Sequence, residues 1–133
     1  MSTRTITVAH GLRLLPLREV LAFASAFGRA WMVHSGHAID SGAVPGSVTV
    51  SAAMDGRVYV KRINFQRKRT DRAGEYAYSM LTREPLLAVY IDEQGAQRVC
   101  GTAEYPLHLS MSPGGAVYDC VLEGRDTEDD RYI

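Results

Sequence analysis

Segments in which apolar and polar residues alternate constrain the fold of this chain more than any other feature. Alternate positions are apolar in residues 48–54, and the same period of two recurs in residues 57–67 and 105–111. A period of two places successive side chains on opposite faces of a strand. Asp55-Gly56 separates the first two runs, and this dipeptide favours a type I′ turn, which needs positive φ at two positions. The sequence therefore predicts a hairpin around this turn and a half-buried strand at residues 105–111.

Further strands are expected along the chain. Residues 3–9 alternate, and residues 118–122 place three large side chains on one face. Residues 86–91 are apolar at every position, which indicates a central strand covered on both faces, and residues 97–101 would return beside it. Residues 112–115 contain Pro and two Gly and predict the turn before the last strand.

Two segments carry a helical pattern. In residues 17–33 the apolar side chains recur at helical spacing, so we expect a helix there. Phe23 and Gly28 fit that spacing less well, and a pair of strands is the alternative. Residues 70–83 also fit a helix, with Thr70 as its N-cap, although alternation within the segment leaves a strand open.

These elements predict one mainly β domain over residues 1–124. With 133 residues, of which 46% are hydrophobic, the chain is large enough for one core. We expect an antiparallel sandwich or a partly open barrel with one or two short helices packed on it, and an α+β fold is the alternative. Residues 125–133 form an acidic tail that is polar enough to be disordered.

Two cysteines, Cys100 and Cys120, are too few for a disulfide framework or a zinc site. Opening the predicted turns symmetrically places Cys120 opposite Leu107 and Cys100 opposite Leu87 or Val89. We therefore expect both thiols to be reduced and buried.

Charge is balanced overall but uneven along the chain. The net charge is zero, with 15 basic and 15 acidic residues, so no global field favours nucleic acid or a membrane surface. One basic stretch and one acidic stretch are the predicted partner-binding residues: Lys61, Arg62, Arg67, Lys68, Arg69 and Arg72, and Glu123, Asp126, Glu128, Asp129 and Asp130. Their complementarity favours head-to-tail association of copies of the chain. The rival interpretation is that the two stretches meet within one chain.

No sequence pattern indicates catalysis. Nucleophile and phosphate-binding motifs are absent, so we expect no enzyme and no cofactor. His34, His37 and Asp40 are the weak basis of a metal-dependent enzyme as an alternative. A second alternative is a small-molecule-binding β domain that uses the aromatic side chains of Trp31, Tyr76 and Tyr78.

The expected location of the protein also rests on sequence features that are not found. No apolar run approaches the roughly 20 residues that span a bilayer. The first residues do not resemble a signal peptide. We expect a cytoplasmic protein where it is made, with no membrane partner. Nucleic acid is a disfavoured partner, because alternation along a strand divides the basic stretch between two faces.

An ordered series of segments resembles a known group of proteins. Residues 55–59 (DGRVY), 86–95 (LLAVYIDEQG) and 101–107 (GTAEYPL) carry the resemblance. The series is similar to small virion-associated proteins encoded among the head–tail and tail genes of prophages in gut Bacteroides-type bacteria. The resemblance covers about the last ninety residues and has no catalytic residues to carry over. It implies a structural or assembly role, in an oligomeric ring or another part of a virion.

The sequence thus favours a non-enzymatic structural or assembly protein. Its expected partners are further copies of itself or other virion proteins, and its expected locations are the cytoplasm and the virion.

Overall fold

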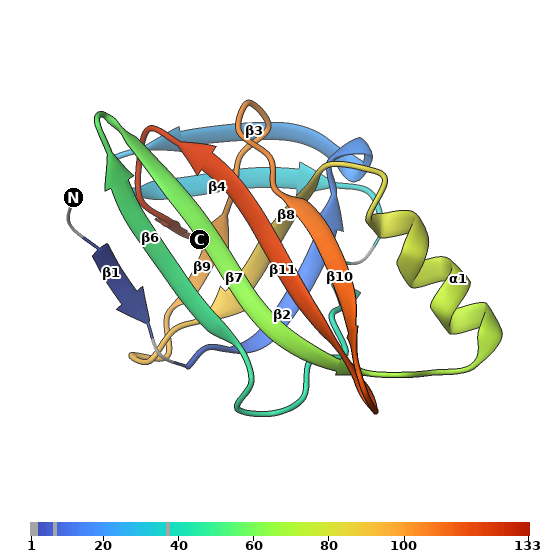
Figure 1. Ribbon diagram of the computed structural model, residues 1–133. Coiled ribbons are helices and arrows are strands. Elements are labelled where there is room, and N and C mark those ends of the chain that lie inside the picture. Colours follow the sequence, from blue (N-terminus) through green and yellow to red (C-terminus); the bar gives the residue numbers. More distant parts are fainter. Residues whose placement is uncertain (1–2, 7, 37) are drawn as a thin grey trace.

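Two β-sheets pack face to face, and one α-helix lies beside them (Figure 1). The computed structural model describes residues 3–6, 8–36 and 38–133. The elements follow the order β1 (Thr3–Ile6), β2 (His10–Pro16), the 3₁₀ turn η1 (Leu17–Glu19), β3 (Val20–Ala26), β4 (Arg29–His34), β5 (Ile39–Asp40), β6 (Thr49–Asp55), β7 (Val58–Lys68), α1 (Arg72–Leu81), β8 (Leu86–Ile91), β9 (Gln97–Cys100), β10 (His108–Gly114), β11 (Val117–Asp126) and β12 (Arg131–Tyr132). One sheet has the strand order β1-β6-β7-β11-β10, and the other has the order β3-β4-β12-β9-β8-β2-β5. The predicted β-sandwich with a short helix is confirmed.

The hairpin of β6 and β7 confirms the strongest local prediction. Asp55 pairs with Val58, so Gly56 and Arg57 form a two-residue loop. Gly56 has a φ of 68°, whereas Arg57 is not among the described residues with positive φ. Positive φ at the first loop position alone is the pattern of a type II′ turn, so the predicted type I′ geometry is wrong.

Residues 17–33 do not form the predicted helix. They form η1 and the hairpin of β3 and β4, which was the alternative. Phe27 and Gly28 connect the two strands with φ values of 55° and 75°, and positive φ at both positions is the type I′ pattern. Val20, Phe23 and Met32 pack on a core cluster of Leu15, Ala30, Leu87, Val89 and Val99. This tertiary contact outweighs the local helical spacing.

The helix predicted at residues 70–83 is confirmed as α1. Its N-cap is Asp71 rather than the predicted Thr70, because the Asp71 carboxylate accepts a hydrogen bond of 2.8 Å from the backbone N–H of Gly74. Tyr78 and Leu81 are the buried residues of the helix and attach it to the main core.

Strand β8 separates two apolar clusters. Leu86, Ala88 and Tyr90 face the main core between the sheets, whereas Leu87 and Val89 face the second cluster with Val99. β8 lies between β2 and β9, so the predicted central strand with both faces covered is confirmed.

Both cysteines are free and buried, as predicted. Their pairing partners differ from the prediction. Cys120 lies opposite Met111, because the loop between β10 and β11 consists of residues 115–116 rather than 112–115. Cys100 lies opposite Ala88, between the two predicted positions.

Residues 125–133 belong to the folded structure rather than to a disordered tail. β11 continues to Asp126, and β12 joins the seven-stranded sheet between β4 and β9. Asp126, Asp130 and Arg131 are buried. A polar composition predicts exposure only where the charges lack partners within the fold.

We predict that Gly56→Ala lowers the free energy of unfolding by about 1 kcal/mol, because a Cβ is disfavoured at positive φ. A Cβ at this position meets no atom within 4 Å, so backbone strain is the expected cause. Arg57→Ala, at the exposed neighbouring loop position, is the matched control and should have little effect. Chemical unfolding of the three proteins tests this, and equal stability of Gly56→Ala and wild type would contradict the turn assignment.

Candidate functional site

The basic and acidic stretches meet inside one chain. β7 and β11 are antiparallel neighbours, and their register places Lys61 opposite Gly124 and Arg62 opposite Glu123. Of the predicted partner-binding residues, Lys61, Arg67, Asp126 and Asp130 are buried. Asp129 is half-buried, and the others are exposed: Arg62, Lys68, Arg69, Arg72, Glu123 and Glu128. The burial supports the rival interpretation, in which the two stretches pair within the chain.

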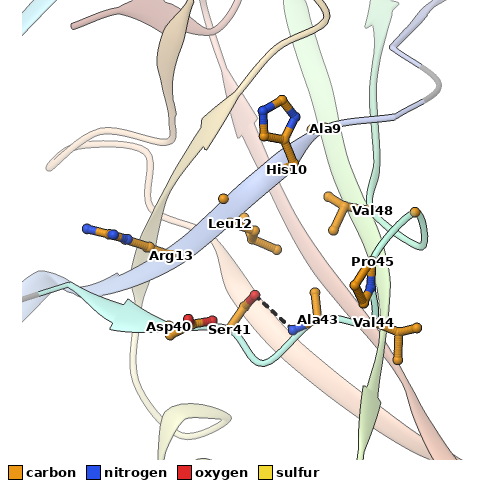
Figure 2. A pocket seen from close by; sticks show the side chains of 12 residues that line it. Ala9, His10, Leu12, Arg13, Asp40, Ser41, Ala43, Val44, Pro45 and Val48 are labelled. Carbon is orange, nitrogen blue, oxygen red and sulfur yellow. Dashed lines mark hydrogen bonds between the residues drawn. The ribbon is translucent and has the colours of Figure 1, made fainter. Parts of the chain in front are cut away.

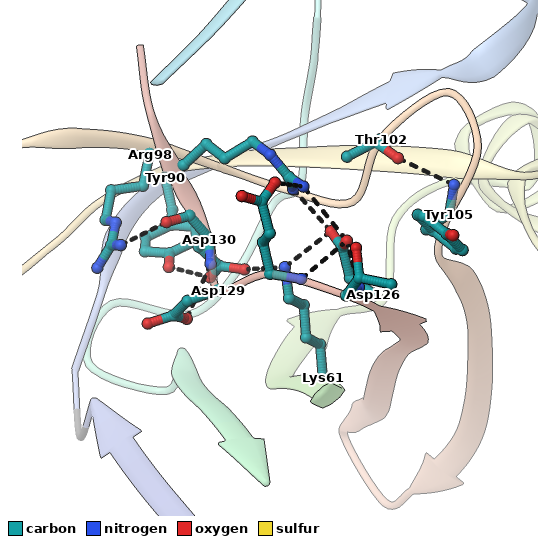
Figure 3. A network of polar contacts seen from close by, with 11 residues as sticks. Lys61, Tyr90, Arg98, Thr102, Tyr105, Asp126, Asp129 and Asp130 are labelled. Carbon is teal, nitrogen blue, oxygen red and sulfur yellow. Dashed lines mark hydrogen bonds and ion pairs between the residues drawn. The ribbon is translucent and has the colours of Figure 1, made fainter. Parts of the chain in front are cut away.

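Four residues form a buried charge cluster: Lys61, Asp126, Asp130 and Arg131 (Figure 3). The ammonium Nζ of Lys61 lies 3.1 Å from Asp126 Oδ2 and 3.0 Å from Asp130 Oδ1. The guanidinium of Arg131 donates to both carboxylate oxygens of Asp126, at 2.7 and 3.3 Å. Each buried charge is therefore close to at least one opposite charge, as burial requires.

The cluster joins the two sheets. Lys61 and Asp126 lie on β7 and β11 of the five-stranded sheet, whereas Arg131 lies on β12 of the seven-stranded sheet. Tyr90 on β8 donates its hydroxyl hydrogen bond to Asp130 Oδ2, and Arg98 on β9 donates to the Asp130 carbonyl. Figure 3 shows these side chains converging on the segment between β11 and β12.

Lys61 and Asp126 keep their charges at neutral pH. Burial opposes the charged form of Lys61, but the nearby carboxylates of Asp130 and Asp126 outweigh it and raise the pKa of Lys61. Burial also opposes the charged form of Asp126, but hydrogen bonds from Arg131 and Lys61 outweigh it and lower the pKa of Asp126. A buried lysine that stays protonated is held by its carboxylate partners as an ion pair.

Arg67 has a second structural role. Its guanidinium lies 4.0 Å from the ring centroid of Tyr78 and 4.9 Å from that of Tyr118, and it pairs with the carboxylate of Glu75. Tyr78 and Glu75 belong to α1, whereas Arg67 is on β7. These cation–π and ionic contacts hold the helix on the sheet.

The structure also reveals a surface that the sequence analysis did not identify. We call it the hairpin surface, formed by the exposed apolar side chains of β3 and β4 and their turn. Leu21 is 68% exposed, Phe27 102%, Trp31 56% and Val33 59%. A groove of about 510 Å³ lies here, lined by residues of β3 and β4 and by Ile133. Large exposed apolar patches commonly mark interaction sites.

Alternation within the hairpin explains the exposure of Trp31 and Val33, whereas Leu21 lies at the bulge of β3 and Phe27 in the turn. Phe23 and Met32 pair across the strands and pack on the second core cluster. Trp31 and Val33 are each one position away from Met32 and lie on the opposite face, where they pair with Ala24 and Ala22. Trp31 and Val33 are two positions apart, so the strand interpretation of this segment predicts that both side chains lie on the same face.

A second pocket, of about 270 Å³, lies between β2 and the loop after β5 (Figure 2). His10, Arg13, Asp40 and Ser41 supply polar side chains to its lining. The Ser41 hydroxyl accepts a hydrogen bond from the Ala43 backbone N–H at 3.2 Å, and Asp40 Oδ1 accepts one from Gly42 at 2.9 Å. These groups therefore stabilise their own loop.

The structure does not bring together the three aromatic side chains of the predicted small-molecule site. Tyr78 is buried and donates to the Ser41 carbonyl, whereas Tyr76 is exposed on α1, and the groove beside Trp31 contains neither tyrosine. His37 lies outside the described residues. Within residues 3–6, 8–36 and 38–133, no three His, Cys, Asp or Glu side chains are grouped as metal ligands.

Comparison with known proteins identifies no relative: no family model matches the chain, and no curated protein or solved structure is similar to it. Among the described residues, no helix has the length and apolar character needed to cross a membrane.

We predict that Lys61→Met destabilises the fold by about 3–5 kcal/mol, because it leaves the buried Asp130 carboxylate without its ion pair, while Asp126 keeps only Arg131. Arg62→Met is the matched control on the same strand, since the Arg62–Glu123 pair has side chains 51% and 48% exposed. An exposed pair contributes about 0–1 kcal/mol. Urea unfolding measures both effects, and similar stabilities of the two variants would contradict the structural role of Lys61.

Proposed function

We propose that this protein is a non-enzymatic structural protein that assembles with copies of itself through the hairpin surface. The observation that carries the proposal is the gathering of four large exposed apolar side chains, Leu21, Phe27, Trp31 and Val33, on one hairpin. The leucines of β2 and the leucines and valine of β8 are buried, by contrast. Exposing this area to water is unfavourable, and a partner that covers it gains that free energy.

The charges of the chain contribute less to assembly than the sequence suggested. Lys61 pairs with Asp126 and Asp130, Arg62 with Glu123, and Arg67 with Glu75. Charges that are already paired within a subunit contribute little to the contact with a second copy. We therefore propose that apolar contact, rather than head-to-tail attraction between charges, drives self-association.

The resemblance of residues 55–59, 86–95 and 101–107 to small virion-associated proteins supports the kind of assembly that we propose, a particle of a phage or prophage. The buried charge cluster supports a structural role further, because it fixes one arrangement of the two sheets instead of placing reactive groups at a surface. A subunit of a large assembly benefits from such a fixed shape.

A second candidate function is the binding of a small apolar ligand in the groove beside Trp31. The volume of about 510 Å³ falls within the range of ligand pockets. Trp31 is the single tryptophan of the chain, so its fluorescence reports directly on this groove. A saturable fluorescence change with an apolar probe such as 1-anilinonaphthalene-8-sulfonate, in a protein that stays monomeric, would favour this candidate over assembly.

We predict that the double variant Leu21→Ser/Trp31→Ser weakens self-association by at least about tenfold in Kd, because it removes large apolar contacts from the interface. Tyr76→Ser/Met80→Ser is the matched control, since Tyr76 and Met80 are exposed on α1. Light scattering across a concentration series measures the association. A wild-type protein that stays monomeric at high concentration would overturn the proposed function, as would equal association of the hairpin variant and the wild type.

A further inference from the structure

We infer that the hairpin surface binds a second copy of this chain edge to edge, with β3 of one copy pairing antiparallel to β3 of the other. The inference rests on the proposed function and specifies the geometry of its contact. The joined sheet would run through β4, β3, β3 of the partner and β4 of the partner, related by a two-fold axis.

β3 is an open edge of the seven-stranded sheet. It pairs with β4 on one side, and in the described part of the chain no backbone hydrogen bond reaches residues 20–26 from the other side. A free edge carries a row of unpaired N–H and C=O groups that can pair with another strand.

The sequence of β3 lacks the features that normally block such pairing. Proteins protect their edges with charged residues, proline or very short strands. β3 has seven residues, VLAFASA, with no charge and no proline. A bulge between Val20 and Ala22 affects only its first residues.

The other sheet edges are protected. β5 has two residues, and the described part of β1 has four, so both are short where the structure describes them. β10 has seven residues but contains Pro113, which lacks an N–H donor. Among the four edges of the two sheets, β3 is therefore the one suited to edge pairing.

A second copy is the occupant that fits this edge best. Antiparallel pairing of a strand with itself is self-complementary, because a two-fold axis presents the same residues from both sides. The absence of charge on β3 means that the pairing meets no like-charge repulsion.

Edge pairing places the hairpin surfaces of the two copies side by side on one face of the joined sheet. Ala22 and Ala24 on β3 lie opposite Val33 and Trp31 on β4. In the joined sheet, small alanine side chains from both copies lie at the centre, with the large side chains of both copies on either side. The alanines leave room for the indole of Trp31 to extend over the junction.

A cysteine scan across residues 21–26 tests the geometry. A two-fold axis perpendicular to the joined sheet places one residue of β3 opposite its own copy, at a Cβ distance close to that of a disulfide. We expect oxidation to cross-link dimers at that one position and not at the others. Cys100 and Cys120 are buried, so the wild type should give no cross-link. Ser112→Cys, on the β10 edge, is the matched control.

Ala24→Lys gives an independent readout, because it adds a charge at the exposed edge without removing a core side chain. We expect it to raise the dimer Kd by at least about tenfold and to leave the unfolding midpoint nearly unchanged. Ser110→Lys on β10 is its control and should dimerise as the wild type does.

The outcomes separate this inference from the proposed function. Self-association without position-specific cross-links in β3 would overturn the edge pairing and leave the proposed function intact. A wild-type protein that stays monomeric, and instead binds phosphatidylcholine vesicles through the hairpin, would overturn both.

Discussion

The buried ammonium of Lys61 is the constraint on which the rest of the structure depends. A buried charge requires opposite charges around it, and Asp126 and Asp130 supply them. Their positions draw the C-terminal segment over the end of the sandwich, where Arg131 begins β12. β12 in turn holds the β3–β4 hairpin, because the Tyr132 N–H donates to the Gly28 carbonyl at 2.9 Å. The charge cluster thus determines where the hairpin lies.

This dependence links the interior of the protein to its surface. The chain uses its most concentrated charges internally and leaves its apolar hairpin in contact with solvent. Elsewhere the described residues keep the usual distribution, with an apolar core and most charged side chains outside. The exposed apolar hairpin departs from that distribution, which is why we propose assembly as the function.

The extent to which the sequence predicted this structure depended on the range of the interactions involved. The β6–β7 hairpin and α1 follow from local patterns, a glycine turn and helical spacing, and both were predicted. Residues 17–33 carried both helical and strand patterns, and only packing on the second core cluster decides between them. The order of the C-terminal segment depends on Lys61, which is remote in sequence. The sequence contained one indication of this. Lys61, Ile63 and Phe65 occupy alternate positions of β7, so a strand places the lysine on the same face as the two core side chains.

The most direct test of the central claim is the salt dependence of self-association in the wild-type protein. Sedimentation or light scattering would compare the dimer Kd at low salt with the Kd at about 1 M sodium chloride, where charges are screened beyond about 3 Å. Because Lys61, Arg62 and Arg67 pair within the chain and β3 carries no charged residue, we predict that the Kd stays unchanged or decreases at high salt. A dimer that dissociates as salt is added would show that exposed charges hold the copies together and would contradict the account.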